Sequence, residues 1–385
     1  MTSTPDATGA SRALRLPVRP ELAGIEPYGA PQLDVPVLLN VNENPYGPSP
    51  AVVSSIAAAV AEAAAGLNRY PDRDFLGLRG DLAEYLAGES GVRVGAEQVW
   101  AANGSNEVML HVLQAFAGPG RTVVSFAPTY SMYPEYARDT HSAYVVGRRE
   151  ADFMLDPQHA VSVIAEHQPS VIILTSPNNP TGTALSQDTI VAVCEAALAV
   201  DVDGAPAVVV VDEAYGEFRR EGVPSALELL ERFPNLAVSR TMSKAFALAG
   251  ARLGYLVARQ AIVDALRVVR LPYHLSAVTQ ATARAALSHS AELLGQVAEL
   301  RAERDRTVEW LRAQTHDGRP LDVAASDSNF VLFGRFADRH AVWQGLLDRG
   351  VLIRETGPDA WLRVSIGTRE EMAAFKDALV EVAGL

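Results

Sequence analysis

Short runs of β-branched and other apolar residues alternate with helix-like segments over most of this chain, and this alternation restricts the fold more than any other feature. The runs include "TVVSFAP", "SVIILTSP" and "AVVVVDEAY", and helix-like spacing appears between them, as in "SNEVMLHVLQAFA". Near-continuous Val, Ile and Leu strands separated by helices are typical of a mostly parallel sheet that is buried on both faces. The sequence therefore predicts an α/β fold.

The chain from residue 287 onward follows a different pattern. A long helix-like segment, "AELLGQVAELRAERDRTVEWLRAQ", leads into the short apolar runs "NFVLFGRF", "VLIRE" and "WLRVSIG", with helix-like segments between and after them. This part is expected to form a smaller α+β domain of residues 287–385. The start of the chain is expected to be an arm of residues 1–45, which leaves residues 46–286 for the large domain with the mostly parallel sheet.

Composition and charge narrow the class of protein. The chain is 48% hydrophobic and 21% charged, as folded water-soluble proteins are, and its formal net charge of -13 argues against a nucleic-acid partner. No apolar run has the roughly 18 to 20 residues that cross a bilayer, and no signal-peptide pattern opens the sequence. The single cysteine, Cys194, is expected to be buried in a helix. We therefore predict a cytoplasmic protein without a nucleic-acid or membrane partner.

Polar or aromatic residues follow five of the predicted strands at the point where each strand ends. They are Ser105 and Asn106 in "NGSNE", Tyr130, Asn179, Asp212 with Tyr215, and Lys244. In open parallel sheets, ligands bind beyond the carboxyl ends of the strands, where loops carry the functional residues. The sequence therefore predicts one site at this edge of the sheet.

Each of these residues also has an ordinary structural explanation. Asn179 before Pro180 is typical of a simple turn, and Asp212 or Ser105 could cap a helix. A single lysine in a loop, such as Lys244, is usually a surface residue. What favours a functional site is that all five positions meet at one edge of one sheet.

An amine in an apolar loop that is rich in hydroxyl groups suits the formation of an imine, because removal from water lowers the pKa of a lysine and frees its nucleophile. Pyridoxal phosphate uses such a lysine. It also needs a carboxylate at its pyridine nitrogen, neutral donors at its phenolic oxygen, an aromatic ring over its face and an anion site for its phosphate. The candidate carboxylate is Asp212, the candidate donors to the phenolic oxygen are Asn179 and Tyr215, and the candidate ring is Tyr130. The candidates for the phosphate site are Ser105, Asn106, Thr241, Ser243 and Arg252.

Longer stretches match a known family in order, from about residue 25 to 367, and include "LNVNENPYGPSP", "NRYPDRD", "SPNNPTG", "VDEAYGEF" and "RTMSKAFALAGARLGYLVA". In these stretches the sequence resembles the fold-type I pyridoxal-phosphate aminotransferases, and among them the actinobacterial histidinol-phosphate aminotransferases. The resemblance implies the fold-type I α/β fold and a metal-free transamination. In it, L-histidinol phosphate and 2-oxoglutarate would give imidazole acetol phosphate and L-glutamate. The sequence departs from the family at Asn106, where aspartate is usual.

The resemblance also implies a role for individual residues. Lys244 would form the imine with the cofactor and move the proton of the substrate. Asp212 would hold the pyridinium, while Asn179 and Tyr215 would hold the phenolic oxygen. Tyr70 of "NRYPD" would reach the cofactor phosphate region of the partner subunit, which implies a homodimer.

Two arginines in the predicted smaller domain, Arg354 in "VLIRE" and Arg363 in "WLRVSIG", bear on the substrate. Two cations suit the nearly doubly charged phosphate monoester of histidinol phosphate, whereas one bidentate arginine satisfies the carboxylate of a common amino acid. Arg354 could also be a solvated charge at a strand end. Further candidates for the substrate pocket are Tyr28, Tyr70, Tyr273 and Asn329, the first and last of which could equally serve in packing.

Other functions stay open on the sequence alone. An aromatic amino-acid aminotransferase is the nearest alternative, because it would share "RYPD" and the lysine loop. A nicotinamide dehydrogenase is disfavoured, since no G-x-G-x-x-G follows an early strand. A transcription regulator with an aminotransferase-like domain would need a DNA-binding domain, and the arm before Asn40 is too short for one.

Overall fold

The computed structural model describes residues 16–27 and 29–385, which divide into a unit that ends at residue 31 and a unit of residues 32–385. The described residues of the first unit contain the 3-10 helix η1 (Pro20–Leu22). The second unit contains a seven-stranded sheet with its helices and a smaller part built on a three-stranded sheet. Tyr28, a candidate for the substrate pocket, lies outside the described residues.

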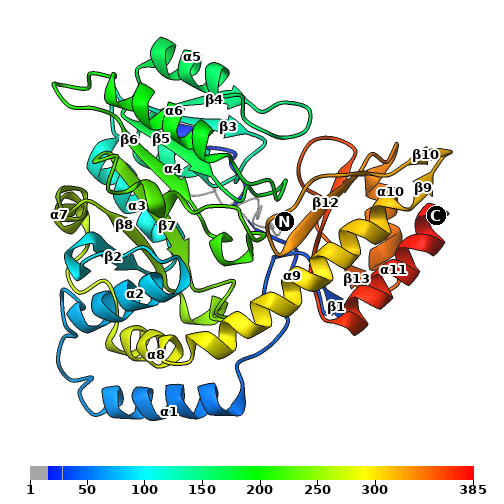
Figure 1. Cartoon of the computed structure of the whole chain (residues 1–385), viewed down its shortest axis with the longest axis horizontal. Helices are drawn as coiled ribbons and strands as arrows, with labels where there is room; N and C mark the ends of the chain where they lie inside the picture. Colours follow the sequence, from blue (N-terminus) through cyan, green and yellow to red (C-terminus); the bar gives the residue numbers. More distant parts are fainter. Residues whose placement is uncertain (1–15, 28) are drawn as a thin grey trace, which may run out of the picture. The chain divides into compact units, whose positions relative to one another are not determined.

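The seven-stranded sheet has the strand order β2-β8-β7-β6-β5-β3-β4 (Figure 1). The five strands from β7 to β4 are parallel, and β8 runs antiparallel to both β7 and β2. Every residue of β5, β6 and β8 is buried, which explains their near-continuous apolar sequences and confirms the predicted α/β fold. The strands are β2 (Val99–Ala102), β3 (Thr122–Ala127), β4 (Ala143–Arg148), β5 (Val171–Thr175), β6 (Val208–Asp212), β7 (Leu236–Thr241) and β8 (Gly254–Ala258).

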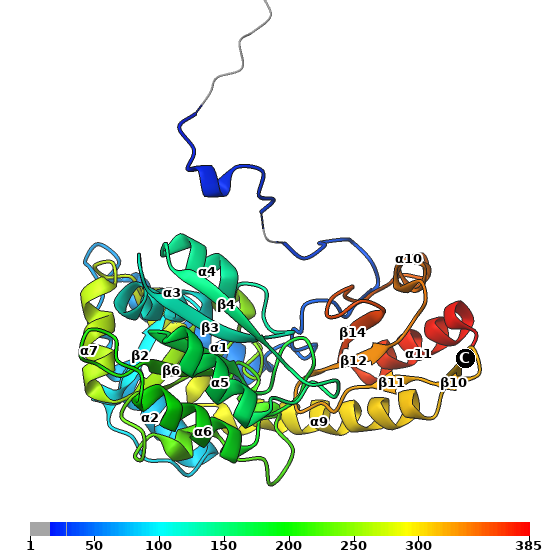
Figure 2. The same ribbon diagram turned by 90° about the horizontal axis from the view of Figure 1, so that it is seen from above.

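Helices cover both faces of this sheet (Figure 2). One face carries α3 (Ser105–Phe116), α4 (Tyr133–Asp139) and α7 (Gln260–Val269), and the other carries α2 (Leu76–Glu89), α5 (Pro157–His167) and α6 (Gln187–Leu198). Outside α2 lie α8 (Ala277–Leu287) and α1 (Pro50–Ala64). Cys194, in α6, is fully buried as expected. Short 3-10 helices are η2 (Ala96–Gln98), η3 (Gly216–Phe218), η4 (Ala226–Leu229) and η5 (Ala249–Ala251).

The smaller part is built on the antiparallel strands β11 (Asp322–Val323), β12 (Phe330–Gly334) and β14 (Trp361–Ser365). Helices α9 (Ser290–Arg312) and α10 (Arg339–Leu347) pack on these strands, and α11 (Arg369–Ala383) packs on α10. A two-stranded element joins β9 (Thr315–His316) and β10 (Arg319–Pro320), and another pairs β1 (Val37–Leu38) in parallel with β13 (Val351–Leu352). The domain boundaries at 45/46 and 286/287 stay a prediction. No helix in the described part of the chain is long and apolar enough to cross a membrane.

A buried group of charged side chains joins the ends of β6 and β7 to helix α2. Arg240 of β7 is fully buried. Its guanidinium contacts the carboxylates of Glu89 in α2 (2.7 Å), Glu213 just after β6 (2.8 Å) and Glu217 in η3 (3.5 Å). Burial alone would raise the pKa of Glu213, but Arg240 holds it below its usual value. Because neighbouring residues of a strand point to opposite faces, this cluster lies on the other side of β7 from Thr241.

Replacing Arg240 with alanine is expected to destabilise the protein by about 3–5 kcal/mol, because the buried carboxylates of Glu213 and Glu217 lose their ion pairs with it. Urea unfolding followed by circular dichroism measures the loss as a lower midpoint. Arg349→Ala is the matched control, since Arg349 pairs with the exposed Glu381 and such surface pairs contribute at most about 1 kcal/mol. Equal midpoints for the two variants would show that the buried cluster does not stabilise the strand ends.

Candidate active site

The carboxyl ends of β5, β6 and β7 bring several of the predicted site residues to one edge of the sheet. In the parallel register, Thr175 pairs with Asp212, and Asp212 pairs with Ser239. Thr241 is the last residue of β7, and Lys244 lies three residues further on, in the loop after the strand. This edge therefore places an acid, hydroxyl groups and an amine at the ends of neighbouring strands.

Asp212 is buried at the end of β6, with 6% of its surface exposed. Its carboxylate accepts a hydrogen bond from the Tyr133 hydroxyl at 2.8 Å and another from the Ala214 backbone N–H at 3.1 Å. Burial raises the pKa of Asp212 to about 6, and the two hydrogen bonds oppose that rise. The half-buried Tyr130 meets the Tyr133 ring edge-on, with 5.6 Å between ring centres. Asp212 is thus a carboxylate that is shielded from solvent and can pair with a cationic nitrogen.

Lys244 lies in the loop after β7, and its Nζ donates a hydrogen bond to the Val41 carbonyl at 2.9 Å. Burial lowers the pKa of Lys244 to about 8, the positive charges of Arg363 and Arg252 act in the same direction, and Glu43 opposes them. A lysine with such a pKa has an unprotonated fraction near neutral pH that an exposed lysine lacks. The amine is therefore suited to act as a nucleophile or base.

The structure brings Thr241, Ser243 and Arg252 together. The oxygens Thr241 Oγ1 and Ser243 Oγ lie 3.0 Å apart, and the Ser243 backbone N–H donates to Thr241 Oγ1 at 3.1 Å. Arg252 Nη1 donates to Ser243 Oγ at 3.3 Å. Two hydroxyl groups and a guanidinium suit an anion with several acceptor oxygens.

Two glycines let the start of α3 approach this group. Gly104, which precedes α3, has a φ of 88°, and a β-carbon there would lie 2.6 Å from Arg252 Nη2. A β-carbon on Gly254 would lie 2.1 Å from the backbone nitrogen of Ser105. Within the described residues no side chain caps the N-terminus of α3, so the N–H groups of its first turn can bind an anion. Ser105 is half-buried here, and Asn106 is exposed.

Asn179 and Tyr215 are each held by a side chain from another part of the chain. The Asn179 amide oxygen accepts a hydrogen bond from Arg363 Nη1, and Arg363 Nη2 donates to the Asn40 carbonyl at 2.9 Å. Tyr215 is buried, and its hydroxyl accepts from Asn42 Nδ2 at 2.9 Å. Arg363 thereby links the smaller part of the unit to the edge of the large sheet.

Arg354 and Arg363 lie directly opposite each other. The backbone N–H of each donates to the carbonyl of the other at 2.9 Å, as in one rung of an antiparallel ladder. Residues that face each other in such a rung place their side chains on the same face. The guanidinium of the buried Arg363 also lies over the Phe330 ring, 5.0 Å from its centre. Two adjacent cations of this kind suit an anion with more than one negative charge.

Asn42 joins both parts of the unit, although its sequence position did not single it out. Its side chain donates to Tyr215, its backbone N–H donates to Ser365 Oγ at 2.9 Å, and its carbonyl accepts from the buried Asn329 at 3.0 Å. The three asparagines of "LNVNENPYG" between apolar residues were a signal that could have drawn attention to this segment. Asn329 therefore contacts the backbone of Asn42 and helps to hold this segment in place.

Tyr70 and Tyr273 stack on each other, with ring centres 4.3 Å apart and an interplanar angle of 11°. Tyr70 is 79% exposed and Tyr273 is 38% exposed. Both rings therefore lie on the surface of the single chain, stacked on each other.

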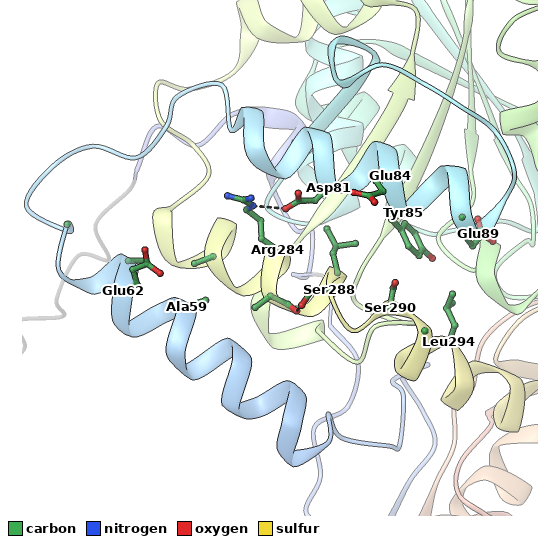
Figure 3. A pocket seen from close by; sticks show the side chains of 17 residues that line it. Ala59, Glu62, Asp81, Glu84, Tyr85, Glu89, Arg284, Ser288, Ser290 and Leu294 are labelled. Atoms are coloured by element: carbon green, nitrogen blue, oxygen red, sulfur yellow. Dashed lines mark hydrogen bonds and ion pairs between the residues drawn. The ribbon is translucent and has the colours of Figure 1, made fainter.

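An open groove of about 1040 Å³ lies away from this edge, between α1, α2, α8 and α9 (Figure 3). Glu62, Glu84 and Glu89 line it, and Arg284 pairs there with Asp81 at 2.6 Å. None of its lining residues is a predicted site residue. The groove is therefore separate from the candidate active site.

The chain belongs to the class I and II aminotransferases. The model of this family, described as aminotransferase class I and II, matches residues 35–379. That range includes all the strand-end residues described above.

Individual relatives lie within the same family. Histidinol-phosphate aminotransferase of Bifidobacterium adolescentis is 58% identical over 372 residues, which cover 95% of this chain and 95% of that protein. Histidinol-phosphate aminotransferase of Thermobifida fusca is 60% identical over 369 residues, 96% of each chain. The crystal structure of histidinol-phosphate aminotransferase from Sinorhizobium meliloti in complex with pyridoxal-5'-phosphate has a TM-score of 0.76 and covers 91% of each chain. At 23% identity, that structure supports the fold.

Lys244 is expected to become reactive with an acylating reagent at about pH 8, because its amine loses its proton there. The chain has only two lysines, Lys244 and Lys376, so peptide mass mapping after competitive acetylation at a series of pH values measures both in one sample. Lys376, which pairs with Glu303 at 3.4 Å, is the internal reference. Arg363→Leu should move the Lys244 midpoint to higher pH. A Lys244 midpoint near the usual lysine value of about 10.4, with or without Arg363, would refute this account of the amine.

Proposed function

We propose that this chain is a pyridoxal-phosphate-dependent transaminase of histidine biosynthesis. The reaction transfers the amino group of L-histidinol phosphate to 2-oxoglutarate and gives imidazole acetol phosphate and L-glutamate. The observation that carries the proposal is the pairing of Arg354 with Arg363, together with the effect of Arg363 on the Lys244 amine. The relatives that are 58% and 60% identical are histidinol-phosphate aminotransferases, which supports the same substrate.

The donor groups at the sheet edge fit pyridoxal phosphate. The close approach of Arg252 to the start of α3, which a β-carbon at Gly104 would prevent, gives the phosphate a cradle of the right chemistry. When bound, the cofactor supplies an electron sink for negative charge at the substrate α-carbon. The residues that would hold it are Asp212 at the pyridine nitrogen, Asn179 and Tyr215 at the phenolic oxygen, Tyr130 over the ring, and Ser105, Asn106, Thr241, Ser243 and Arg252 at the phosphate.

Lys244 and Asp212 act on two different protons of the reaction. The Lys244 amine, with its pKa of about 8, takes the proton from the α-carbon of the amino donor, and the Val41 carbonyl orients it through the hydrogen bond to Nζ. The ionised Asp212 would hold the pyridine nitrogen of the cofactor in its protonated form, because a carboxylate favours the cationic form of its partner. The two residues thus have separate roles, Lys244 toward the proton of the substrate and Asp212 toward the charge of the cofactor ring.

Arg354 and Arg363 bind the end of the substrate that distinguishes it from common amino acids. The phosphate monoester carries a charge of roughly -1.5 to -2 near neutral pH, which two guanidinium groups neutralise better than one. In the second half-reaction Arg363 binds a carboxylate of glutamate. The partners of the enzyme are therefore small molecules, and we place it in the cytoplasm with the metabolites of amino-acid biosynthesis.

We further propose that the active unit is a homodimer. The loop that carries Tyr70 lies beside the loop of Tyr273 and the first turn of α8, because the two tyrosines stack and Gln280 of α8 donates to the Asp72 carbonyl at 3.1 Å. A group of exposed apolar side chains on neighbouring segments is typical of a protein interface. In the dimer, Tyr70 of each subunit reaches the cofactor phosphate region of the other. The exposed apolar residues in or next to these loops are Leu67, Tyr70, Val268, Leu271 and Tyr273.

Purified protein is expected to transaminate L-histidinol phosphate with 2-oxoglutarate much faster than phenylalanine. Arg354→Leu should lower kcat/KM for histidinol phosphate by about 100-fold, which corresponds to the loss of roughly 3 kcal/mol of charge-assisted binding. It should affect phenylalanine far less. Arg349→Leu, on the surface, is the control and should leave both rates unchanged. If phenylalanine were the far better donor, the chain would be an aromatic amino-acid aminotransferase and the substrate proposal would fall.

Mixing two inactive variants tests the shared site. The protein should sediment at twice its chain mass of 41.2 kDa, and Tyr70→Ala and Lys244→Ala should each be inactive alone. After exchange of subunits, each mixed dimer contains one complete site, so random mixing should restore about a quarter of the wild-type activity. Mixing Lys244→Ala with Lys244→Met is the control and should restore none. A dimer whose mixture stays inactive would exclude a role for Tyr70 across the interface.

A further inference from the structure

We propose that Tyr133 is a positioning residue that keeps Asp212 ionised and correctly oriented, through a directed chain of hydroxyl groups that begins at Thr129 and passes through Thr175. The proposal deepens the proposed function, because Asp212 is the residue that would hold the cofactor nitrogen. Tyr133 itself would touch neither cofactor nor substrate. It would act only through Asp212.

The chain of hydroxyl groups runs without a gap from Thr129, in the loop after β3, to the carboxylate of Asp212. Tyr133 is the first residue of α4 and is fully buried. Its hydroxyl oxygen lies 2.8 Å from Asp212 Oδ2 and 2.8 Å from Thr175 Oγ1, and Thr175 Oγ1 lies 3.1 Å from Thr129 Oγ1. Three hydroxyl groups and one carboxylate thus follow one another at hydrogen-bond distance.

Counting protons fixes the direction of the chain. Each hydroxyl group has one proton to donate, and an ionised carboxylate can only accept. When Asp212 is ionised, the Tyr133 proton must therefore go to Asp212. The Thr175 proton then goes to Tyr133, and the Thr129 proton goes to Thr175. A hydrogen bond donated to a charged carboxylate is about twice as strong as one between neutral groups, so this direction of the chain favours the ionised carboxylate.

The surroundings of Asp212 make this donor important. Within the described chain, Tyr133 is the only side chain that donates to the carboxylate, and the Ala214 N–H is the other donor. The charge of Glu213, which acts on Asp212, is also negative, and burial raises the pKa of Asp212 to about 6. The pKa of Tyr133 lies well above its ordinary value, chiefly because of burial, so the phenol stays protonated and remains a donor. Without Tyr133, Asp212 would lose the strongest of the groups that oppose its protonation.

Tyr133→Phe tests this role, because it removes the hydroxyl group and keeps the ring that Tyr130 contacts. Carboxyl carbon NMR of the cofactor-free protein, with Asp212→Asn to assign the signal, measures the titration of Asp212. The pKa of Asp212 should rise by about one to two pH units, the loss expected for one hydrogen bond to a charged group. Thr175→Val should shift it in the same direction by less. Tyr144→Phe is the matched control, since it removes a tyrosine hydroxyl from edge strand β4, which β5 and β3 separate from β6.

Cofactor binding gives a second measurement. At neutral pH the dissociation constant for pyridoxal phosphate should increase by about 2- to 10-fold in Tyr133→Phe, because a rise of the Asp212 pKa from about 6 to about 7 or 8 lowers its ionised fraction by that factor. The difference from wild type should shrink as the pH rises above the new Asp212 pKa, because the carboxylate is then ionised in both proteins. Tyr144→Phe should bind as wild type does.

The outcomes separate this inference from the proposed function. An Asp212 titration that is the same in wild type and in folded Tyr133→Phe would overturn the role of Tyr133. If Tyr133→Phe failed to fold, an unchanged titration in Thr175→Val would overturn the directed chain. A wild-type protein that binds no pyridoxal phosphate would instead overturn the proposed function, while the NMR titration would still decide whether Tyr133 controls Asp212.

Discussion

The in-register pairing of β5, β6 and β7 is the constraint on which the site depends. It sets Thr175 and Asp212 side by side, and a slip of one residue would turn Asp212 to the opposite face and put Glu213 in its place. Side-chain contacts on both faces of the sheet oppose such a slip. Arg240 pairs with Glu213 on one side, and Tyr133 donates to Asp212 on the other. The acid that faces the site and the acid that stabilises the sheet therefore cannot exchange places.

One cation of the site, Arg363, interacts with several neighbouring groups at once. Arg363 donates to Asn179 and to the Asn40 carbonyl, stands opposite Arg354, and contributes to the lowered pKa of Lys244. Such a position requires the smaller part of the unit to pack directly against the strand ends. The segment around Asn42 provides that contact, since it bonds to residues of both parts. The pairing of the two arginines and the lowered pKa of the Lys244 amine are thus consequences of the same packing.

Much of this arrangement could be predicted from the sequence. Alternating apolar runs indicated the α/β fold, and residues at strand ends, such as Lys244 and Asp212, were found because their position follows from the strand pattern alone. Tyr133 and Asn42 were missed, because their contacts join residues 79 and 323 positions apart in the chain and leave no local periodicity. Tyr70 and Tyr273 were assigned to the pocket from the family resemblance, and the single chain places them on its surface.

The scarcity of lysine in the chain has a consequence for covalent selectivity. Arginine provides almost all of the positive charge, and its guanidinium, which stays protonated, does not condense with aldehydes as an amine does. Of the two lysine side chains, Lys376 is engaged with Glu303 on the smaller part of the unit. A reactive carbonyl compound that diffuses along this protein therefore meets very few competing side-chain amines on its way to Lys244. The scarcity of lysine therefore protects the specificity of the site.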